Sequence, residues 1–354
     1  MSTHAEALAS TLPSSGADAP VYQHLLALSD DIGVFEHALF DVPRIEHGYC
    51  VDDVSRALIV GAREPTPSEA LRQATATYLD FVDAAVTGDG RVHNRCNVEG
   101  MWTDAPTVGD WWGRAIWASG IAATVMSEHQ HREQARAIAL RAMQQSSPFV
   151  RANVFAVLGA AELLLQIPED DLTRQFVLDA LSKIPRAPSG AWEWPEERLQ
   201  YANGSYVDAL MVAGGALGDV ALVGRGLELL AFLLDLESDG RRLSVTGVGG
   251  SSPQSPRPQF DQQPIEVAAL ADACARAFAY TGEVGWLDGL DMAWAWFDGQ
   301  NDSHVRMYDP VTGAGFDGLE RDGRNENRGA ESTLAALSTH QHVVRLRLFL
   351  ADHS

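Results

Sequence analysis

Apolar residues recur along most of the chain at intervals of three and four positions, and sustained alternation with a period of two is almost absent. This spacing predicts about twelve helices, each with one buried face. They span residues 21–40, 51–63, 68–86, 110–128, 131–146, 149–166, 170–183, 204–217, 219–235, 263–281, 283–298 and 329–350. The first span contains the polar segment SDDIG, so two short helical pieces are an alternative there. The pattern predicts an all-α fold.

The links between these helices alternate in length. Short links follow the second, fourth, sixth, eighth and tenth helices, so each of those helices turns back as an antiparallel hairpin. Long links cover residues 87–109, 184–203, 236–262 and 299–328. Such hairpins must stack on their neighbours to bury their apolar faces. We therefore predict an (α/α)6 toroid, a closed double ring of helices. The alternative, an open superhelix of helix pairs, would show a repeat of fixed length.

The predicted domain organisation is simple. Residues 1–19 are small and polar, contain Pro and Ser, and lack the basic start and apolar core of a signal peptide. They are predicted to form a disordered N-terminal tail. Because no Pro/Gly-rich break divides the rest, residues 20–354 are predicted to form a single toroid domain.

Composition excludes several classes of partner. The chain has 26 Lys and Arg residues against 48 Asp and Glu residues, a formal net charge of −22. This charge repels phosphate backbones and anionic lipids, so we expect no nucleic acid and no membrane as partner. Cys50, Cys96 and Cys274 are far apart and odd in number, which favours a cytoplasmic location over a disulfide framework. No motif indicates a metal ion or another cofactor.

The long links of a double ring share one rim and lead into the N-termini of the inner helices. Five of these six starts combine aromatic, amide and acidic residues, whereas the sixth, SSPFVRA, is a plain cap. The five are EHGYCVDD, TVGDWWGRA, WEWPEERLQYANGSY, FDQQPIE and RNENRGAES. Aromatic faces beside carboxylates and amides suit a sugar ring, which offers C–H faces for stacking and hydroxyls for hydrogen bonds. We therefore expect an oligosaccharide or another sugar-containing molecule as substrate.

Cleavage of a glycosidic bond requires two carboxyl groups, one acting as acid and the other as base or nucleophile. Carboxylates on different inner helices can face each other across the hollow of the ring. The catalytic candidates ranked highest are Asp53, Asp110, Glu266 and Glu331, with Asp208 and Glu326 behind them.

The expected substrate-binding residues come from the same helix starts. Trp111 and Trp112 cannot both face inward, because successive residues of a helix point in different directions. Arg56 and Arg114 each lie one turn beyond an acid, and a salt bridge to that acid is an equal alternative to substrate contact. The full set is Glu46, His47, Tyr49, Asp52, Arg56, Trp111, Trp112, Arg114, Trp194, Asn203, Asp261, Gln262, Gln263 and Asn327.

A purely structural interpretation of the acids is also open. Acids in a first turn accept hydrogen bonds from free backbone N–H groups and interact favourably with the helix dipole. The predicted outer helices also begin with acids, at Glu69, Glu133, Asp171, Asp219 and Glu283. Asp52 and Glu266 can therefore be helix caps. The outer starts lack the accompanying aromatic and amide residues.

Four motifs together carry a family resemblance: GVFEHALFDVPRIEHGYCVDDVSRAL, WWGRAIWA, FDQQPIEVAALADAC and NENRGAESTLAAL. They resemble a family of bacterial proteins often labelled glycosyltransferase or glycosidase-related, over residues 30–345. The resemblance implies an all-α toroid like those of many polysaccharide-processing enzymes and sugar epimerases. In many relatives the region stands alone or follows a nucleotide-sugar glycosyltransferase domain, which implies a glycosyltransferase as a candidate partner. This chain itself has no Gly-rich strand-to-helix turn for a diphosphate.

The resemblance also implies a set of shared positions. This chain departs from the pattern at Asn327-Arg328-Gly329, where relatives often have Asn-Gln-Gly, which puts an amide role there in doubt. The implied positions are Glu46, His47, Gly48, Tyr49, Asp52, Asp53, Arg56, Trp112, Gly113, Arg114, Gln263, Pro264, Glu266, Ala268, Asn327, Gly329, Ala330, Glu331 and Ser332.

These observations favour a carbohydrate-active enzyme that cleaves or rearranges a glycosidic bond with paired carboxylates in a central cleft. Two rival hypotheses stay open. A sugar epimerase or isomerase would use His47 as a proton shuttle and place it deep in the hollow. A non-catalytic glycan-binding module would have aromatic residues on the rim but carboxyl groups too far apart to act as a pair.

Overall fold

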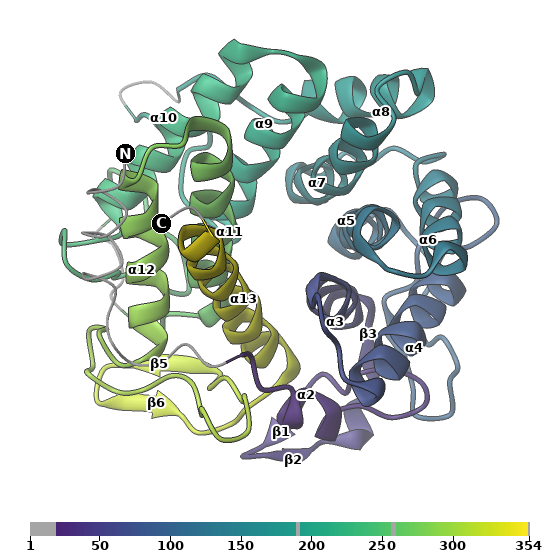
Figure 1. Cartoon of the computed structure of the whole chain (residues 1–354), viewed down its shortest axis with the longest axis horizontal. Helices are drawn as coiled ribbons and strands as arrows, with labels where there is room; N and C mark the ends of the chain where they lie inside the picture. Colours follow the sequence, from purple (N-terminus) through teal and green to yellow (C-terminus); the bar gives the residue numbers. More distant parts are fainter. Residues whose placement is uncertain (1–18, 189–191, 256–259, 353–354) are drawn as a thin grey trace.

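The computed structural model describes residues 19–188, 192–255 and 260–352; the predicted tail, residues 1–19, lies outside them except for its last residue. Within the described residues, six long helices form an inner ring (Figure 1). They are α3 (Val51–Arg63), α5 (Asp110–Val125), α7 (Val150–Gln166), α9 (Asn203–Leu217), α11 (Pro264–Thr281) and α13 (Ala330–Asp352). Each packs against the next, and α13 packs against α3, so the ring is closed.

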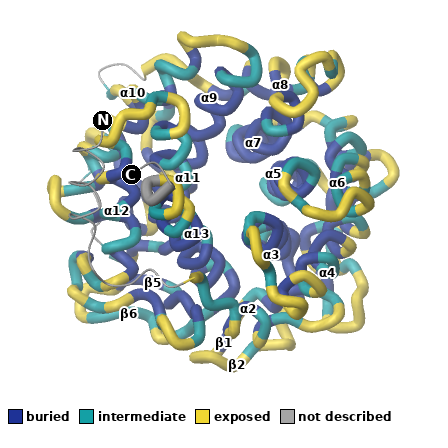
Figure 2. The backbone as a smooth tube through the Cα atoms, viewed as in Figure 1, coloured by how far each residue is buried: buried dark blue, intermediate teal, exposed yellow. Residues whose placement is uncertain are grey.

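Five further helices surround this ring. They are α4 (Glu69–Ala85), α6 (His129–Ala142), α8 (Asp171–Ser182), α10 (Val220–Leu236) and α12 (Gly285–Phe297). Each packs on the inner helix beside it in the chain. The inner helices are buried on nearly all sides, whereas the outer helices expose one face to solvent (Figure 2). The all-α (α/α)6 toroid predicted from the alternating links is therefore confirmed.

The first predicted helix, residues 21–40, is wrong over most of its length. Only α2 (Gln23–Ala27) is helical, and it packs where the ring closes, against α13 and α4. Asp30 ends the helical run because its carboxylate accepts from the backbone N–H groups of Ile32 and Gly33, at 2.9 and 3.1 Å. Such Asx turns compete with helix continuation. This short helix and the loop after it occupy the place of a sixth outer helix.

Glycines set the spacing between α5 and α7. A Cβ atom at Gly120 would lie 2.3 Å from the carbonyl oxygen of Gly159, and one at Gly159 would lie 2.1 Å from that of Ile116. The two backbones touch at this point, so no larger residue fits. This close approach brings the start of α5 beside the start of α7.

Short antiparallel strand pairs lie in the segments between the helices. They are β1 (Ala38–Leu39) with β2 (Val42–Pro43), β3 (Tyr49–Cys50) with β4 (Arg95–Cys96), and β5 (Gly318–Glu320) with β6 (Gly323–Asn325). A 3-10 turn, η1 (Ile45–His47), precedes β3. The pairing of β3 with β4 joins the segment directly before α3 to the link 87–109. None of the described helices is both long and apolar enough to cross a membrane.

Candidate functional site

A cavity of about 680 Å³, here called the central cavity, opens where the inner helices begin. Residues at or just before all six inner helix starts line it, so segments far apart in the sequence meet around one hollow. The lining residues from these starts are Cys50, Asp52, Asp53 and Arg56 (α3); Gly109, Asp110, Trp111 and Arg114 (α5); Phe149 (α7); Tyr201 (α9); Gln263 (α11); and Gly329, Glu331 and Ser332 (α13).

The acids at these starts do not cap their own helices. Three outer helices have a side-chain cap from their own N-cap residue: Ser68 in α4, Asp170 in α8 and Asp219 in α10. In α3, α5, α7, α9 and α11 the N-cap residue makes no such hydrogen bond. The structural interpretation therefore holds for Asp219, whereas Asp52, Asp53 and Asp110 cap no helix start among the described residues.

Arg56 joins two carboxylates across the gap between α3 and α13. One guanidinium nitrogen lies 2.5 Å from Asp53 Oδ1 and the other 2.6 Å from Glu331 Oε2. A single guanidinium fork therefore holds the two nearest oxygens within roughly 7 Å of each other, in the range of paired catalytic carboxyls. Burial raises the pKa of Asp53 to about 6, with Arg56 opposing this shift and Glu331 adding to it.

Arg114 forms a second ion pair on the floor of the central cavity. Its Nε lies 2.9 Å from Asp52 Oδ1, and its guanidinium stacks 3.9 Å above the ring centre of Phe155. Burial and the neighbouring Arg56 lower the pKa of Arg114 to about 10. The sequence left open whether Arg56 and Arg114 pair with acids or bind substrate. Both form ion pairs with acids, and both line the central cavity.

Asp110 differs from these acids, because its carboxylate has no hydrogen bond or ion pair to any described residue. Burial raises its pKa, with Arg114 acting in the opposite direction. Arg114 also interacts electrostatically with Glu331, so this guanidinium is influenced by both carboxyl groups. Asp110 is thus a half-buried acid in the first turn of α5, free to exchange a proton with a ligand.

Aromatic residues also line the central cavity. The Trp111 ring folds back over Gly109, where a Cβ atom would lie only 2.7 Å from it, and Trp111 Nε1 donates to Val92 O at 2.8 Å. Tyr201 is held through its carbonyl, which accepts from Arg151 Nε at 2.7 Å. With Phe149, these rings give aromatic surface to the same cavity that the acids line.

A second cavity of about 560 Å³, here called the side cavity, adjoins the first. The two share Tyr201 and Gln263, and Glu266 lines only the side cavity. The Glu266 carboxylate accepts from Ala202 N at 2.7 Å and Asn203 N at 3.4 Å, so it caps the start of the neighbouring helix α9. Burial raises its pKa to about 7.

Several predicted site residues lie on the rim, outside both cavities. Glu46 and His47 contact each other at 3.8 Å, with side chains that are 60% and 36% exposed. Asn327 accepts from Phe40 N at 2.9 Å. Asp261 is exposed, and its carbonyl accepts from Val248 N at 2.9 Å. The epimerase hypothesis expected His47 deep in the hollow, and the structure places it at the edge.

Three aromatic residues predicted to bind substrate are buried in the protein. Tyr49 donates to Asp30 Oδ2 at 2.5 Å. Trp112 points away from the cavity, and its Nε1 donates to Ala142 O at 3.0 Å. Trp194 packs beside Tyr206. Each therefore positions a loop or helix and does not line either cavity.

Two buried amides from the predicted set also support the site from behind. Asn203 accepts from Arg151 at 3.3 Å through its side-chain oxygen. Gln262 accepts from Trp296 Nε1 at 3.1 Å and donates to Asp302 at 2.7 Å. These contacts fix the segments that carry Tyr201 and Gln263.

Some lining residues were missed by the sequence analysis. Asn94 and Asp317 enter the central cavity from long links, and Glu36 enters it from the segment between α2 and β1. Asp317 accepts from Gly329 N at 2.7 Å, next to the start of α13. Asn94 and Asp317 lie outside the periodic segments, and Glu36 lies in a span that was predicted as helix, so only the folding of the loops over the rim brings them to the site.

One group of side chains has the spacing of a metal site. Among the described residues, ligand atoms of Glu36, Cys50 and Asp53 lie within 4.8 Å of one another. Their charges are already matched, because Arg95 pairs with Glu36 and Arg56 with Asp53. Burial also raises the pKa of the Cys50 thiol, which donates to Asp53 Oδ2 at 3.1 Å. A cation would have to displace these partners.

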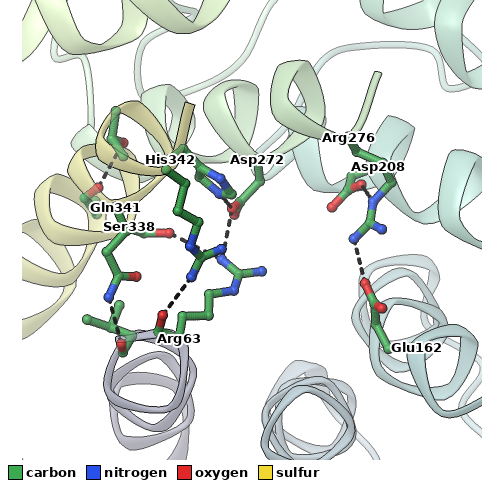
Figure 3. Close-up of polar contacts among 12 residues, drawn as sticks. Arg63, Glu162, Asp208, Asp272, Arg276, Ser338, Gln341 and His342 are labelled. Carbon is green, nitrogen blue, oxygen red and sulfur yellow. Dashed lines mark hydrogen bonds and ion pairs between the residues drawn. The ribbon is translucent and has the colours of Figure 1, made fainter. Parts of the chain in front are cut away.

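Two buried ion-pair clusters lie farther along the inner helices, beyond the central cavity (Figure 3). In one, Arg63 of α3 donates to Asp272 of α11 at 3.0 Å, and His342 of α13 contacts the same oxygen at 2.5 Å. In the other, Arg276 pairs with Asp208 and, at 2.8 Å, with Glu162. Asp208, a secondary catalytic candidate, therefore lies in a structural ion pair outside both cavities.

No protein-family model matches the chain, and no curated protein matches its sequence. Its backbone is similar to solved structures over most of its length. Cellobiose 2-epimerase from Spirochaeta thermophila superposes with a TM-score of 0.67 at 11% identity, over 98% of both chains. A D-mannose isomerase gives 0.68 at 10% identity, over 98% of both chains. The GH76 α-mannanase of Bacteroides thetaiotaomicron gives 0.61 at 11%, over 86% of this chain and 88% of that one. At these identities the similarity shows a shared (α/α)6 toroid fold.

Proposed function

We propose that this protein is a carbohydrate-active enzyme that cleaves or rearranges a glycosidic bond in the central cavity. One observation carries the proposal: first-turn acids and aromatic residues from separate inner helix starts face a single hollow of about 680 Å³. A cavity lined by both aromatic and acidic residues fits a sugar, which stacks through its C–H faces and donates hydrogen bonds through its hydroxyls. The names of structural neighbours, which act on cellobiose, mannose and mannan, support this class of substrate.

We assign the general acid to Asp110. A general acid must hold a proton near neutral pH and must have an oxygen free to approach the leaving group. Burial raises the pKa of Asp110, and its carboxyl has no partner among the described residues. Asp53 has a raised pKa as well, but its two oxygens are engaged by Arg56 and Cys50.

The base or nucleophile in this proposal is Glu331. Its side chain is 40% exposed, and Arg56 binds only one of its oxygens. The guanidinium stabilises the ionised form and fixes its direction. Asp53 then acts as a positioning residue, because it holds Arg56 from the other side.

A second candidate function is epimerisation or isomerisation of a sugar. The favouring observation is that structures named as sugar epimerases and isomerases align over 98% of this chain, more than the mannanase does. In this chain the proton-transfer groups would be Asp110 and Glu331, since His47 lies on the rim. A non-catalytic binding module is less favoured, because Asp53 and Glu331 lie close enough to share one guanidinium.

The test is an assay of Asp110→Asn and Glu331→Gln on a panel of aryl glycosides, oligosaccharides and free sugars. We expect each variant to lose at least roughly a hundredfold in kcat, because each removes a proton-transfer group. Glu326→Gln is the matched control, since Glu326 is an exposed acid of the link before α13, lines neither cavity and pairs with Arg324. Full activity of both cavity variants would end the proposal. Products seen by NMR distinguish bond cleavage from isomerisation.

A further inference from the structure

The side cavity is built by two loops that pair with each other. Leu199 and Ser251 exchange backbone hydrogen bonds of 2.7 and 3.2 Å, which joins the loop before α9 to the glycine-containing loop 246–250. A Cβ atom at Gly250 would lie 2.0 Å from Leu199 O, so only glycine allows this approach. The hollow between them is about 560 Å³, similar in size to the central cavity.

Thr246 in this hollow has an unused hydroxyl. The residue is 2% exposed, and its backbone N–H donates to Glu237 Oε1 at 2.7 Å. Its Oγ1 has no hydrogen-bond partner among the described residues. Buried hydroxyls in folded proteins are nearly always hydrogen-bonded, so an orphaned one in a cavity wall points to a ligand.

Glu266 supplies a second polar group on the same hollow. It is 4% exposed, and burial keeps its pKa near 7. The raised pKa favours the protonated carboxyl, which can donate a hydrogen bond. Thr246 and Glu266 together offer donors to a neutral, hydroxylated group.

The rest of the lining mixes polar and apolar residues, with Leu199 and Val248 among the apolar ones. Gln200 and Gln263 contribute amides, and the loop 247–250 contributes backbone groups, whereas Tyr201 is the aromatic residue at the junction with the central cavity. A lining with both polar and apolar groups fits a sugar ring, which has hydroxyls and C–H faces. Because Tyr201 and Gln263 line both hollows, a chain of sugars can pass from one to the other.

We propose that the side cavity binds the next sugar of an oligosaccharide whose reacting ring occupies the central cavity, with Thr246 and Glu266 as its hydrogen-bonding partners. The substrate of this protein is therefore a disaccharide or longer. This inference rests on the proposed function for the identity of the reacting ring. It adds a subsite and a minimum chain length.

The test compares one-sugar aryl glycosides with di- and trisaccharides of the sugar that the panel identifies, using the full-length protein. In the wild type we expect kcat/KM to rise about tenfold or more from one sugar to two, equivalent to roughly one or two well-made hydrogen bonds. Thr246→Val, which keeps the shape of the side chain, is expected to lose most of this gain while its activity on the aryl glycoside is unchanged.

Glu266→Gln provides an independent readout, because its amide donates at every pH. In the wild type the gain from the second sugar should shrink as the pH rises through about 7, and in Glu266→Gln it should not.

Equal activity on one and two sugars, or an equal loss in Thr246→Val on both substrates, overturns the subsite while leaving the proposed function intact. If no sugar substrate is turned over, the proposed function fails. Binding of the disaccharide, measured by calorimetry, then decides the subsite: binding lost in Thr246→Val supports it, and no binding overturns it.

Discussion

Two ion-pair clusters that contain an arginine differ in their ratio of donor side chains to carboxylates. In the buried cluster of Figure 3, two donors, Arg63 and His342, share one carboxylate, Asp272. In the central cavity, two carboxylates, Asp53 and Glu331, share one guanidinium. The carboxylate of the buried cluster therefore has two partners. The two carboxylates in the central cavity share one partner, which leaves negative charge in excess there.

The pKa values of the two aspartates follow from this difference. Burial alone would raise the pKa of Asp272, but Arg63 and the hydrogen bond from His342 outweigh it and hold the pKa well below its usual range. Burial raises the pKa of Asp53 to about 6, because its arginine is shared with Glu331. One cluster therefore keeps its acid ionised inside the ring, and the other holds an acid with a raised pKa beside the central cavity.

The largest expected effect is on stability. Asp272→Asn leaves Arg63 buried without its counter-charge, and we expect the free energy of unfolding to fall by about 3 kcal/mol or more. Asp53→Asn should cost about 1 kcal/mol or less, because burial already disfavours its ionised form and Glu331 still pairs with Arg56. Urea unfolding of both variants measures the difference. Equal losses would show that the two clusters do not differ in structural role.

The next effect separates activity from stability. Arg56→Lys keeps the charge but cannot bridge Asp53 and Glu331 with one fork, so we expect activity to fall roughly tenfold to a hundredfold. The matched change Arg63→Lys in the buried cluster should leave activity within about twofold and reduce stability by about 1 kcal/mol. Steady-state kinetics with the best substrate of the panel, together with unfolding curves, tests both statements. A loss of activity in Arg63→Lys would contradict the assignment of a structural role to the buried cluster and a role in activity to the central cavity.

The smallest effect is a pH dependence of opposite sign in the two clusters. The pKa of Asp53 is raised to about 6 in the folded protein, against about 3.9 in an unfolded chain. Between these values the folded state holds a proton that the unfolded state has released. The contribution of Asp53 to stability therefore falls as the pH rises from about 4 to about 6, by at most roughly 1.4 kcal/mol per pH unit.

Asp272 shows the reverse, since its folded pKa is lowered. Its contribution is present above about pH 4 and is lost as the pH falls below that value. Unfolding measured from pH 3 to pH 8 should show a flatter slope between pH 4 and pH 6 in Asp53→Asn, and a smaller acid-side loss in Asp272→Asn. If Asp53→Asn leaves the slope of stability between pH 4 and pH 6 unchanged, the raised pKa of Asp53 is not the cause of that slope.

Much of the ring could be predicted from local patterns. Helix periodicity depends on neighbouring residues in the chain, and it located every inner helix. The short links forced hairpins, and the alternation of link lengths separated inner helices from outer ones. The helical prediction over residues 21–40 failed because the side chain of Asp30 accepts backbone hydrogen bonds that end the helix early.

The sequence also determined which helix starts carry acids and aromatic residues, because these lie next to the periodic segments. Tertiary structure decided which of them meet. Trp111 lines the cavity and Trp112 is buried, since the orientation of α5 on α6 and α7 sets which side of the helix faces the hollow. Glu36, Asn94 and Asp317 reach the site because the loops fold over the rim.

Which carboxylates share a guanidinium was also beyond the sequence. Arg56 lies three residues after Asp53, and that pair follows from helical spacing. Its second partner, Glu331, is at the other end of the chain and arrives only when α13 packs against α3. Sequence alone thus determined the helices and the residues at their starts, because both depend on short-range geometry. The closed ring decided the charge balance of the site, because that balance depends on contacts between distant segments.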